Sequence, residues 1–281
     1  MTGYVEPGRK HCGKVANMMH LYERAKVYDI AFSYRDIVAE CEFILRVCEH
    51  AGLNVSSIVD LGSGTGAHAL EMAGRGMEVT AIDRMEQMLQ HLLEEAGGRD
   101  YVVRTVNGDM REFAIEREVD CAISMLGTVS HLLSNEDMYA HLSCVARSLR
   151  PGGVYLLEMV HPRDVFSKGS STESRWKVTK GDTTVTVEWG QDGDEFDAVS
   201  EIEEVSTCVT ATRSGKGEVE IIEDVVKQRR YSFQCLRALV QQVDELRIIG
   251  CYGAFDLGVP LSDSAEAWRM IPVLQKSQTG S

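Results

Sequence analysis

Residues 58–83, IVDLGSGTGAHALEMAGRGMEVTAID, constrain the fold of this chain more than any other stretch. A short apolar run from Ile58 to Leu61 stops at a glycine-rich turn, a helix-forming segment follows, and a second apolar run ends on Asp83. Glycines let a backbone turn tightly and approach a ligand closely, and the new helix N-terminus offers free N–H groups. An acid that ends the second strand is placed to accept hydrogen bonds from ribose hydroxyls. The stretch therefore predicts a site for a nucleotide-type cofactor.

Strands and helices alternate along the rest of the chain as far as residue 160, and the alternation resumes near residue 231. This rhythm predicts an α/β fold with a doubly wound, mostly parallel sheet that helices cover on both faces. The last two expected strands form an antiparallel hairpin, and Pro272 in the second of them is expected at a sheet edge. Strands are expected over 101–106, 119–125, 154–160, 245–251 and 269–274, and helices over 85–95, 135–149 and 232–242.

Two regions depart from this rhythm. Val, Thr and charged residues alternate between residues 161 and 230, with glycine-containing turns, which predicts an inserted antiparallel sheet of three or four strands. Residues 17–50 have helical periodicity, interrupted by a less regular, aromatic-rich segment, 27–34, that is suited to cover a cleft as a lid. The expected organisation is an N-terminal helical cap (1–50), a cofactor-binding core (51–160 and 231–281) and an antiparallel insertion (161–230).

Composition restricts the partners of this 281-residue chain. Its formal net charge is −14, whereas proteins that bind a nucleic-acid backbone or an anionic membrane need basic clusters. The eight cysteines include no CxxC pair, so neither a metal site nor a disulfide framework is expected. No apolar run approaches 18 residues. We therefore expect a cytoplasmic protein whose partner is a small molecule.

The glycine pattern alone does not identify the cofactor. Gly62, Gly64 and Ala67 satisfy the GxGxxG/A fingerprint of dinucleotide-binding proteins, so a nicotinamide-dependent oxidoreductase is an alternative. Asp60 argues against it, because a carboxylate two residues before the glycines repels a pyrophosphate and suits a ligand that carries a cation. A second acidic corner, Gly108-Asp109-Met110, ends the third expected strand, and Leu149-Arg150-Pro151-Gly152-Gly153 precedes the fifth.

These motifs together, VDLGSGTG, Asp83, NGDM and LRPGG in this order, resemble those of the class I S-adenosylmethionine-dependent methyltransferases. The resemblance covers roughly residues 55–160, and the family's seven-stranded sheet also accounts for residues 231–276. It implies S-adenosyl-L-methionine as the cofactor and a set of binding residues. The residues that match the glycine loop beside the methionine part are Asp60, Gly62, Ser63, Gly64 and Gly66.

The resemblance also places the adenosine part and the reacting centre. Asp83 matches the acid that binds the ribose hydroxyls, and Arg84 and Met85 flank the adenine. Asp109 and Met110 match the corner that faces the adenine amino group. The position where methyl donor and acceptor meet corresponds to Leu126 and Gly127.

The cap and the insertion are similar to those of small-molecule N-methyltransferases, namely sugar-amine dimethyltransferases and glycine N-methyltransferases. Tyr28-Asp29 matches a Tyr-Asp pair that lines the acceptor pocket of the sugar-amine enzymes. Their Gly-His pair appears here as Ser130-His131, so only the histidine carries over. The resemblance implies an amine nitrogen as acceptor and His131 and Tyr28 as catalytic residues.

Other residues are candidates for further roles at the site. Tyr34 is a candidate to hydrogen-bond the methionine end of the cofactor or the acceptor. His131 has an ordinary pKa of about 6.5 and is suited to relay the acceptor's proton. Four further residues are candidates to shape the acceptor side, although the core or the surface is the preferred location for each: Trp176, Trp189, Glu158 and Glu188.

Two further alternatives stay open at this stage. The chain would be a regulatory protein if it bound the cofactor without catalysing transfer, although His131 and the tyrosines favour an enzyme. The inserted sheet would form a homodimer interface if its exposed strand edges paired with those of a second copy.

Overall fold

The computed structural model describes residues 21–165, 174–215 and 217–278. Its central sheet has the strand order β12-β13-β5-β4-β1-β2-β3, with a short strand β6 that pairs with β13. The path from β5 to β3 is parallel throughout, whereas β13 is antiparallel to both of its neighbours. The mostly parallel sheet and its antiparallel final hairpin were both predicted. The strands are β1 (Ser57–Leu61), β2 (Glu78–Asp83), β3 (Val103–Asn107), β4 (Val119–Ser124), β5 (Leu149–Leu157), β6 (Met159–Val160), β12 (Leu246–Tyr252) and β13 (Arg269–Lys276).

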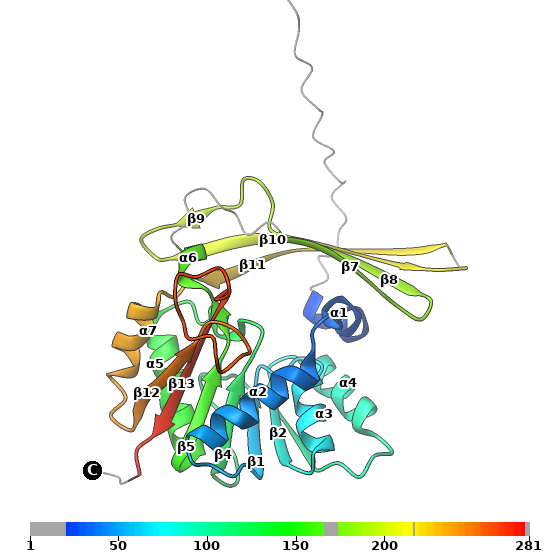
Figure 1. The fold of residues 1–281 in the computed structure, drawn as a ribbon. Coiled ribbons are helices and arrows are strands. Elements are labelled where there is room, and N and C mark those ends of the chain that lie inside the picture. Colours follow the sequence, from blue (N-terminus) through cyan, green and yellow to red (C-terminus); the bar gives the residue numbers. More distant parts are fainter. Residues whose placement is uncertain (1–20, 166–173, 216, 279–281) are drawn as a thin grey trace, which may run out of the picture.

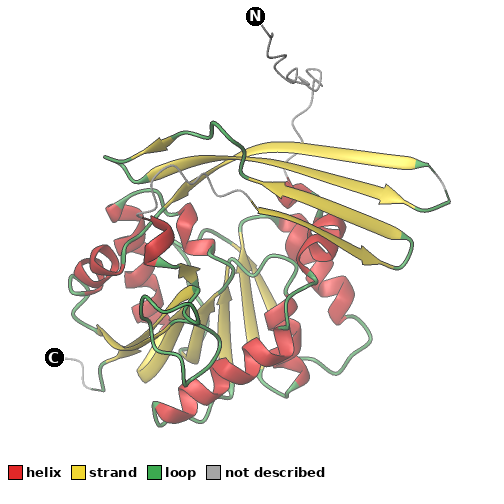
Figure 2. Ribbon diagram, turned by 45° about the horizontal axis from the view of Figure 1, so that its top comes forward, coloured by secondary structure: helices red, strands yellow, loops and turns green. Residues whose placement is uncertain are grey.

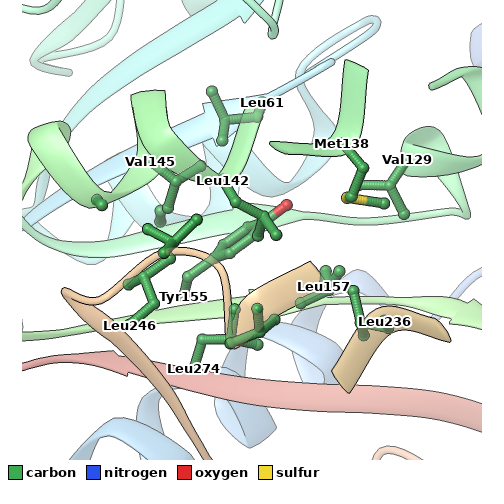
Figure 3. Packing of buried hydrophobic residues seen from close by; sticks show 14 of the residues in the cluster. Leu61, Val129, Met138, Leu142, Val145, Tyr155, Leu157, Leu236, Leu246 and Leu274 are labelled. Atoms are coloured by element: carbon green, nitrogen blue, oxygen red, sulfur yellow. The ribbon is translucent and has the colours of Figure 1, made fainter. Parts of the chain in front are cut away.

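Helices cover both faces of this sheet (Figure 1). Successive side chains of a strand point to opposite faces, so Ile58 and Val59 of β1 enter different hydrophobic clusters. The cluster around Val59 includes Leu142 and Leu236 from two helices and Tyr155 from β5, which Figure 3 shows packed together. One face carries α2 (Ile37–His50), α3 (Ala67–Gly74) and α4 (Glu86–Ala96), and the other α5 (Asn135–Ser148) and α7 (Phe233–Val240).

The insertion forms a second, antiparallel sheet with the order β11-β10-β8-β7, and β9 pairs with β10. Side chains of β10 alternate between buried and partly buried along most of its length, which is the pattern of a sheet with one covered face. Figure 2 shows this sheet as a separate layer beyond the central one. The elements are α6 (Pro162–Val165), β7 (Ser174–Lys180), β8 (Thr183–Trp189), β9 (Phe196–Asp197), β10 (Ile202–Arg213) and β11 (Glu218–Arg229).

The cap begins, within the described residues, with a 3-10 turn η1 (Leu21–Glu23) and helix α1 (Ala25–Phe32). The prediction of a less regular segment over 27–34 was therefore wrong for residues 27–32. Buried Val27 and Ala31 pack against Val187 of the antiparallel sheet in a third hydrophobic cluster, and this packing supports the short helix. Figure 1 shows α1 against β7 and β8. Residues 1–20 of the predicted cap lie outside the described part of the chain.

The predicted position of Pro272 at a sheet edge was also wrong. Pro272 lies in β13, between β12 and β5, and pairs with Cys251 of β12. On its other side, β13 pairs with β6 up to Met270 and with β5 from Val273 onward. Pro272 thus falls in the gap between these two ladders, where its missing N–H removes no pairing. Within the described residues, no helix is both long and apolar enough to cross a membrane.

Candidate active site

A cavity of about 940 Å³ lies between the two sheets. Its floor is made by the segments that follow the carboxyl ends of β1 to β5, which is where parallel α/β sheets bind ligands. Its other walls come from the cap and the antiparallel sheet. The floor residues include Gly62, Gly64, Asp83, Arg84, Met85, Asp109, Met110, Leu126, Gly127, His131 and Glu158, and the other walls include Tyr22, Tyr28, Phe32, Tyr34, Trp176 and Trp189.

The glycine turn after β1 is held in left-handed backbone conformations. Gly62 has φ +66°, and a Cβ at this position would collide with the side chain of Thr128. A Cβ on Gly64, at φ +54°, would lie 3.5 Å from the Tyr28 ring. Side chains here would fill the cavity or displace its walls, so the turn requires glycine.

Asp83 connects the ends of the first two strands. Its carboxylate accepts hydrogen bonds from the backbone N–H groups of Gly64 and Met85, each at 2.8 Å. Burial raises the pKa of Asp83, and these two hydrogen bonds oppose the rise. The acid therefore lies in the cavity wall beside the glycine turn, together with Arg84 and Met85.

The other predicted residues of the glycine loop lie behind this wall. Asp60, Ser63 and Gly66 are not among the described residues that line the cavity. Asp60 is 2% exposed, and burial raises its pKa to about 6, with a nearby histidine, His68, acting in the opposite direction. Gly66 has φ +80° and precedes helix α3. Ser63 Oγ is buried without a hydrogen-bond partner among the residues described.

The corner after β3 is organised by an ion-pair network. Arg111 donates to both carboxylate oxygens of Asp109, at 2.9 and 2.7 Å, and also binds Asp137 at 2.8 Å. The hydrogen bonds from Arg111 lower the pKa of Asp109. The neighbouring Met110 is fixed through its carbonyl, which lies 2.9 Å from Nδ1 of the buried His141. Asp109 and Met110 both face the cavity.

The segment after β4 carries the predicted reacting centre. Leu126 and Gly127 have φ +56° and +69°, and the first of these is unusual for a residue other than glycine. A 3-10 turn, η2 (Thr128–His131), follows and ends on His131. Ser130 also lines the cavity, and its buried Oγ has no hydrogen-bond partner within the described chain.

His131 pairs with Tyr22 of the cap. The Tyr22 hydroxyl lies 3.2 Å from Nε2 of His131, and the two rings meet edge to face. Burial lowers the pKa of His131 to about 4, and the Arg84 guanidinium adds to this effect. Burial raises the pKa of Tyr22 above its usual range. Both groups are thus neutral at pH 7, and they share a hydrogen bond whose direction depends on the tautomer of His131.

Tyr22 was not predicted to be a site residue, because the sequence around it shows only helical periodicity. Tyr28 lies in the cavity wall as expected, packed 4.5 Å from Phe32 between ring centroids. Its neighbour Asp29 instead forms an ion pair with Lys180 at 2.9 Å, away from the cavity-lining residues. Tyr34 lines the cavity but is 56% exposed.

Three of the four residues assigned to core or surface line the cavity instead. Trp176 and Trp189 come from the antiparallel sheet, and Trp176 Nε1 donates to the Ala31 carbonyl at 2.7 Å. Glu158 lies just beyond β5 and is 1% exposed. Glu188 pairs with Arg175 and does not face the cavity. The sequence also gave no signal for further charged residues of the wall, which include Asp164, Glu203, Arg229, Arg230 and Arg269.

Comparison with known proteins agrees with this architecture. Residues 58–153 match the family model described as "Methyltransferase domain". The dTDP-3-amino-3,4,6-trideoxy-alpha-D-glucopyranose N,N-dimethyltransferase of Streptomyces venezuelae is 29% identical over 153 residues, which is 54% of this chain and 63% of that protein. A glycine/sarcosine N-methyltransferase of Aphanothece halophytica is 24% identical over 157 residues, or 55% and 58% of the two chains.

A third relative, the cypemycin N-terminal methyltransferase of a Streptomyces species, is 30% identical over 141 residues, covering 50% of this chain and 57% of the relative. The matched region thus spans less than two thirds of each of these three curated relatives.

Solved structures extend the likeness in fold to most of the chain. An S-adenosylmethionine-dependent methyltransferase from Clostridium acetobutylicum ATCC 824 aligns with a TM-score of 0.73 at 15% identity, covering 92% of this chain and all of that one. Streptomyces venezuelae DesVI aligns with a TM-score of 0.72 at 22% identity, covering 90% and 98%. The chain therefore has the Rossmann-like fold of these proteins, and its residues 58–153 are similar to the methyltransferase domain model.

Proposed function

We propose that this protein is an S-adenosylmethionine-dependent methyltransferase that acts on an amine nitrogen of a small molecule. The observation that carries the proposal is one cavity in which the glycine turn and Asp83 share a space with the Tyr22–His131 pair. The first two features suit a cofactor with a ribose, and the pair suits a protic acceptor. The methyltransferase domain match and the amine-directed names of the curated relatives support the same assignment.

The residues present fit the cofactor. Glycine at positions 62 and 64 keeps the turn free of side chains that would fill the cavity. Ser130 Oγ, a buried hydroxyl in the cavity wall, lacks a hydrogen-bond partner among the described residues and is therefore available to a ligand. S-adenosylmethionine would supply an activated methyl group on its sulfonium. The residues proposed to hold it are Tyr34, Asp60, Gly62, Ser63, Gly64, Gly66, Asp83, Arg84, Met85, Asp109, Met110, Leu126 and Gly127.

Different residues of this set are proposed to bind different parts of the cofactor. Asp83 is proposed to accept from the ribose hydroxyls, and Arg84, Met85 and Met110 to flank the adenine. Asp109 already accepts three hydrogen bonds from Arg111. A carboxylate has about four lone-pair positions, so one remains for the adenine amino group. Asp60, behind the glycine turn, is proposed to act through its negative charge rather than by contact.

On the acceptor side, the chain's own residues orient the nucleophile and receive its proton. The Tyr22 oxygen can accept a hydrogen bond from the acceptor N–H while its own O–H donates to His131. The neutral imidazole is then positioned to take up the proton released by the methylated nitrogen. Because a pKa of about 4 makes it a weak base, alignment and exclusion of water are expected to supply most of the rate enhancement. Tyr28 is proposed to complete the wall over the glycine turn.

A radioactive methyl-transfer screen tests the proposal. Amino sugars, short amino acids and peptide N-termini would be offered with labelled cofactor, alongside alcohols of matched size. We expect label in an amine product, and His131→Ala and Tyr22→Phe should reduce turnover while retaining cofactor affinity. Tyr139→Phe, on the exposed side of α5, is the matched control. Cofactor binding without transfer to any acceptor would instead indicate a regulatory cofactor-binding protein.

We further propose roles for the regions outside the core. The cap (1–50) and the insertion (161–230) are proposed to form the acceptor side, because Tyr22, Trp176 and Trp189 line the cavity. A homodimer through the insertion is supported by the edge strand β11, where Val219, Ile221 and Val225 are about half exposed. Light scattering after size-exclusion chromatography would detect it, and a monomer would contradict it. A cytoplasmic location also stays a prediction.

A further inference from the structure

Glu158 occupies the break between β5 and β6. Its backbone N–H donates to the Ser124 carbonyl at 2.9 Å, and its side chain is 1% exposed and reaches the cavity wall. Removing a carboxylate from water is costly unless it is paired and hydrogen-bonded. The identity of its partners therefore indicates what this buried charge does.

The partners of Glu158 come from three segments that are far apart in the sequence. Oε2 accepts from the Leu126 backbone N–H at 2.7 Å and from Arg35 Nη2 at 2.8 Å. Oε1 accepts from Arg35 Nη1 at 3.2 Å and forms an ion pair with Arg269 Nε at 3.0 Å. One carboxylate thus joins the cap, the segment after β4 and the start of β13.

The contact with Leu126 acts on the histidine side of the proposed site. Leu126 has φ +56°, a left-handed conformation that is strained for a residue with a Cβ. A charge-assisted hydrogen bond to its N–H stabilises this conformation. Because the turn η2 follows at once and ends on His131, the Leu126 backbone determines the direction from which His131 enters the cavity.

The contact with Arg35 acts on the tyrosine side. Arg35 lies between α1 and α2, and its side chain is 7% exposed. Besides Glu158, it binds both oxygens of Glu40, at 2.8 and 2.6 Å, and Glu40 in turn contacts His68. A bidentate arginine clamp of this kind fixes geometry as well as adding energy. Arg35 thereby anchors the C-terminal end of α1, the helix that carries Tyr28.

We propose that Glu158 is a positioning residue that aligns the two halves of the acceptor site. It orients His131 through Leu126, and it orients Tyr28 and the preceding Tyr22 through Arg35. The expected effect of Glu158 on turnover rests on the proposed function, whereas its expected effect on the alignment of the two segments does not.

Glu158→Gln tests the inference, since the amide has nearly the same shape but lacks the charge. Misplacement of reacting groups by about 1 Å can reduce turnover roughly 10²-fold, and we expect a fall in kcat of about this size. Cofactor affinity should fall by a smaller factor than kcat, because Leu126 is only one of the residues proposed to hold the cofactor. The matched control is Asp120→Asn, another buried carboxylate, which binds Ser56, Ser57 and Arg150 at the opposite ends of the strands.

Hydrogen exchange provides a readout that does not depend on activity. Glu158→Gln should accelerate amide exchange in both residues 125–131 and residues 25–32, whereas Asp120→Asn should accelerate neither. Arg35→Gln should accelerate amide exchange in residues 25–32 alone. This variant provides a second test if Glu158→Gln does not fold.

The possible failures are distinguishable. If the wild-type protein transferred no methyl group but exchange rose in both segments, the alignment would stand and the proposed function would fall. Unchanged exchange in either segment of Glu158→Gln would overturn the positioning role. Lost turnover with unchanged exchange would mean that Glu158 acts directly on a bound ligand.

Discussion

At the scale of single residues, the site depends on groups held in unusual electrostatic states. His131 is kept neutral by burial and by the nearby Arg84, and a neutral imidazole can accept a hydrogen bond from the Tyr22 hydroxyl in one of its two tautomers. A cation close to an imidazole disfavours its protonated form. Arg84 follows Asp83, the proposed ribose ligand, so it would link the proposed cofactor side of the cavity to the proposed acceptor side.

This coupling predicts the titration of His131. In the wild-type protein its pKa should lie near 4, and Arg84→Gln should raise it, because a repulsive positive charge is lost. Nuclear magnetic resonance of the histidine Cε1–H group during a pH titration measures both values. Arg104→Gln, on the exposed surface of β3, should leave the His131 titration unchanged. A wild-type midpoint near the ordinary value of about 6.5 would show that His131 is not held neutral in this way.

Individual site residues were predictable to the extent that a local pattern marked them. Gly62, Gly64 and Asp83 belong to a strand–turn–helix–strand motif and all reach the cavity. Tyr22 and Glu158 follow no such motif, because their roles arise from contacts with His131 and Leu126, which lie far away in the sequence. Asp60 is the opposite case, because it belongs to the motif but lies behind the cavity wall.

At the scale of elements, the alternation of strands and helices predicted the central sheet, the helices on its faces and the antiparallel insertion. Two predictions failed where tertiary contacts prevail over local pattern. Residues 27–32 form a helix because apolar side chains of α1 pack against the antiparallel sheet. Pro272 is accommodated inside the sheet because the ladder beside it is interrupted.

The glycine turn after β1 gives a prediction at this scale. Gly62→Ala places a Cβ at φ +66° and against Thr128, so it should both strain the turn and displace η2. Gly76→Ala is the matched control, because Gly76 has φ +89° with open space around it. Both changes should lower stability by about 1–2 kcal/mol for the left-handed backbone. Only Gly62→Ala should also weaken cofactor binding, which isothermal titration would measure. Equal affinities for the two variants would contradict a close approach of the cofactor to the Gly62 backbone.

At the scale of the whole molecule, the cavity exists because two separately packed bodies meet across it. Two hydrophobic clusters cover the faces of the central sheet, and a third joins the cap to the antiparallel sheet. Phe32 and Trp176 meet at 5.6 Å between ring centroids across the third cluster. Periodicity along the sequence indicates that each ring belongs to an amphipathic element, but it does not indicate which distant element it meets. The acceptor side was for this reason the least predictable part of the site.

Buried histidine also makes the stability of the whole fold sensitive to pH. His141 is a fully buried residue of α5 whose Nε2 lies 2.8 Å from the Tyr155 hydroxyl of β5, and burial lowers its pKa to about 4. The unfolded chain binds its proton near pH 6.5, so the stabilisation from neutral His141 is complete above that pH and is lost as the pH falls towards 4. The loss amounts to about 3 kcal/mol.

Urea unfolding at pH 7 and at pH 4.5 measures this dependence. Wild type should lose stability between the two conditions, and His141→Gln should lose less, because its side chain does not titrate. His50→Gln, at the exposed end of α2, is the surface control. An equal loss in wild type and His141→Gln would contradict the role assigned to His141.

The proposed function depends on binding of S-adenosylmethionine in the cavity, with its ribose on Asp83. Isothermal titration of the wild-type protein and of Asp83→Ala with S-adenosylhomocysteine, and separately with NAD, measures this binding. Loss of a hydrogen bond to a charged group costs about 1.5–3 kcal/mol, so Asp83→Ala should bind S-adenosylhomocysteine roughly ten- to a hundredfold more weakly. Wild type should show no binding of NAD. Tight binding of NAD together with no binding of S-adenosylhomocysteine would contradict the account.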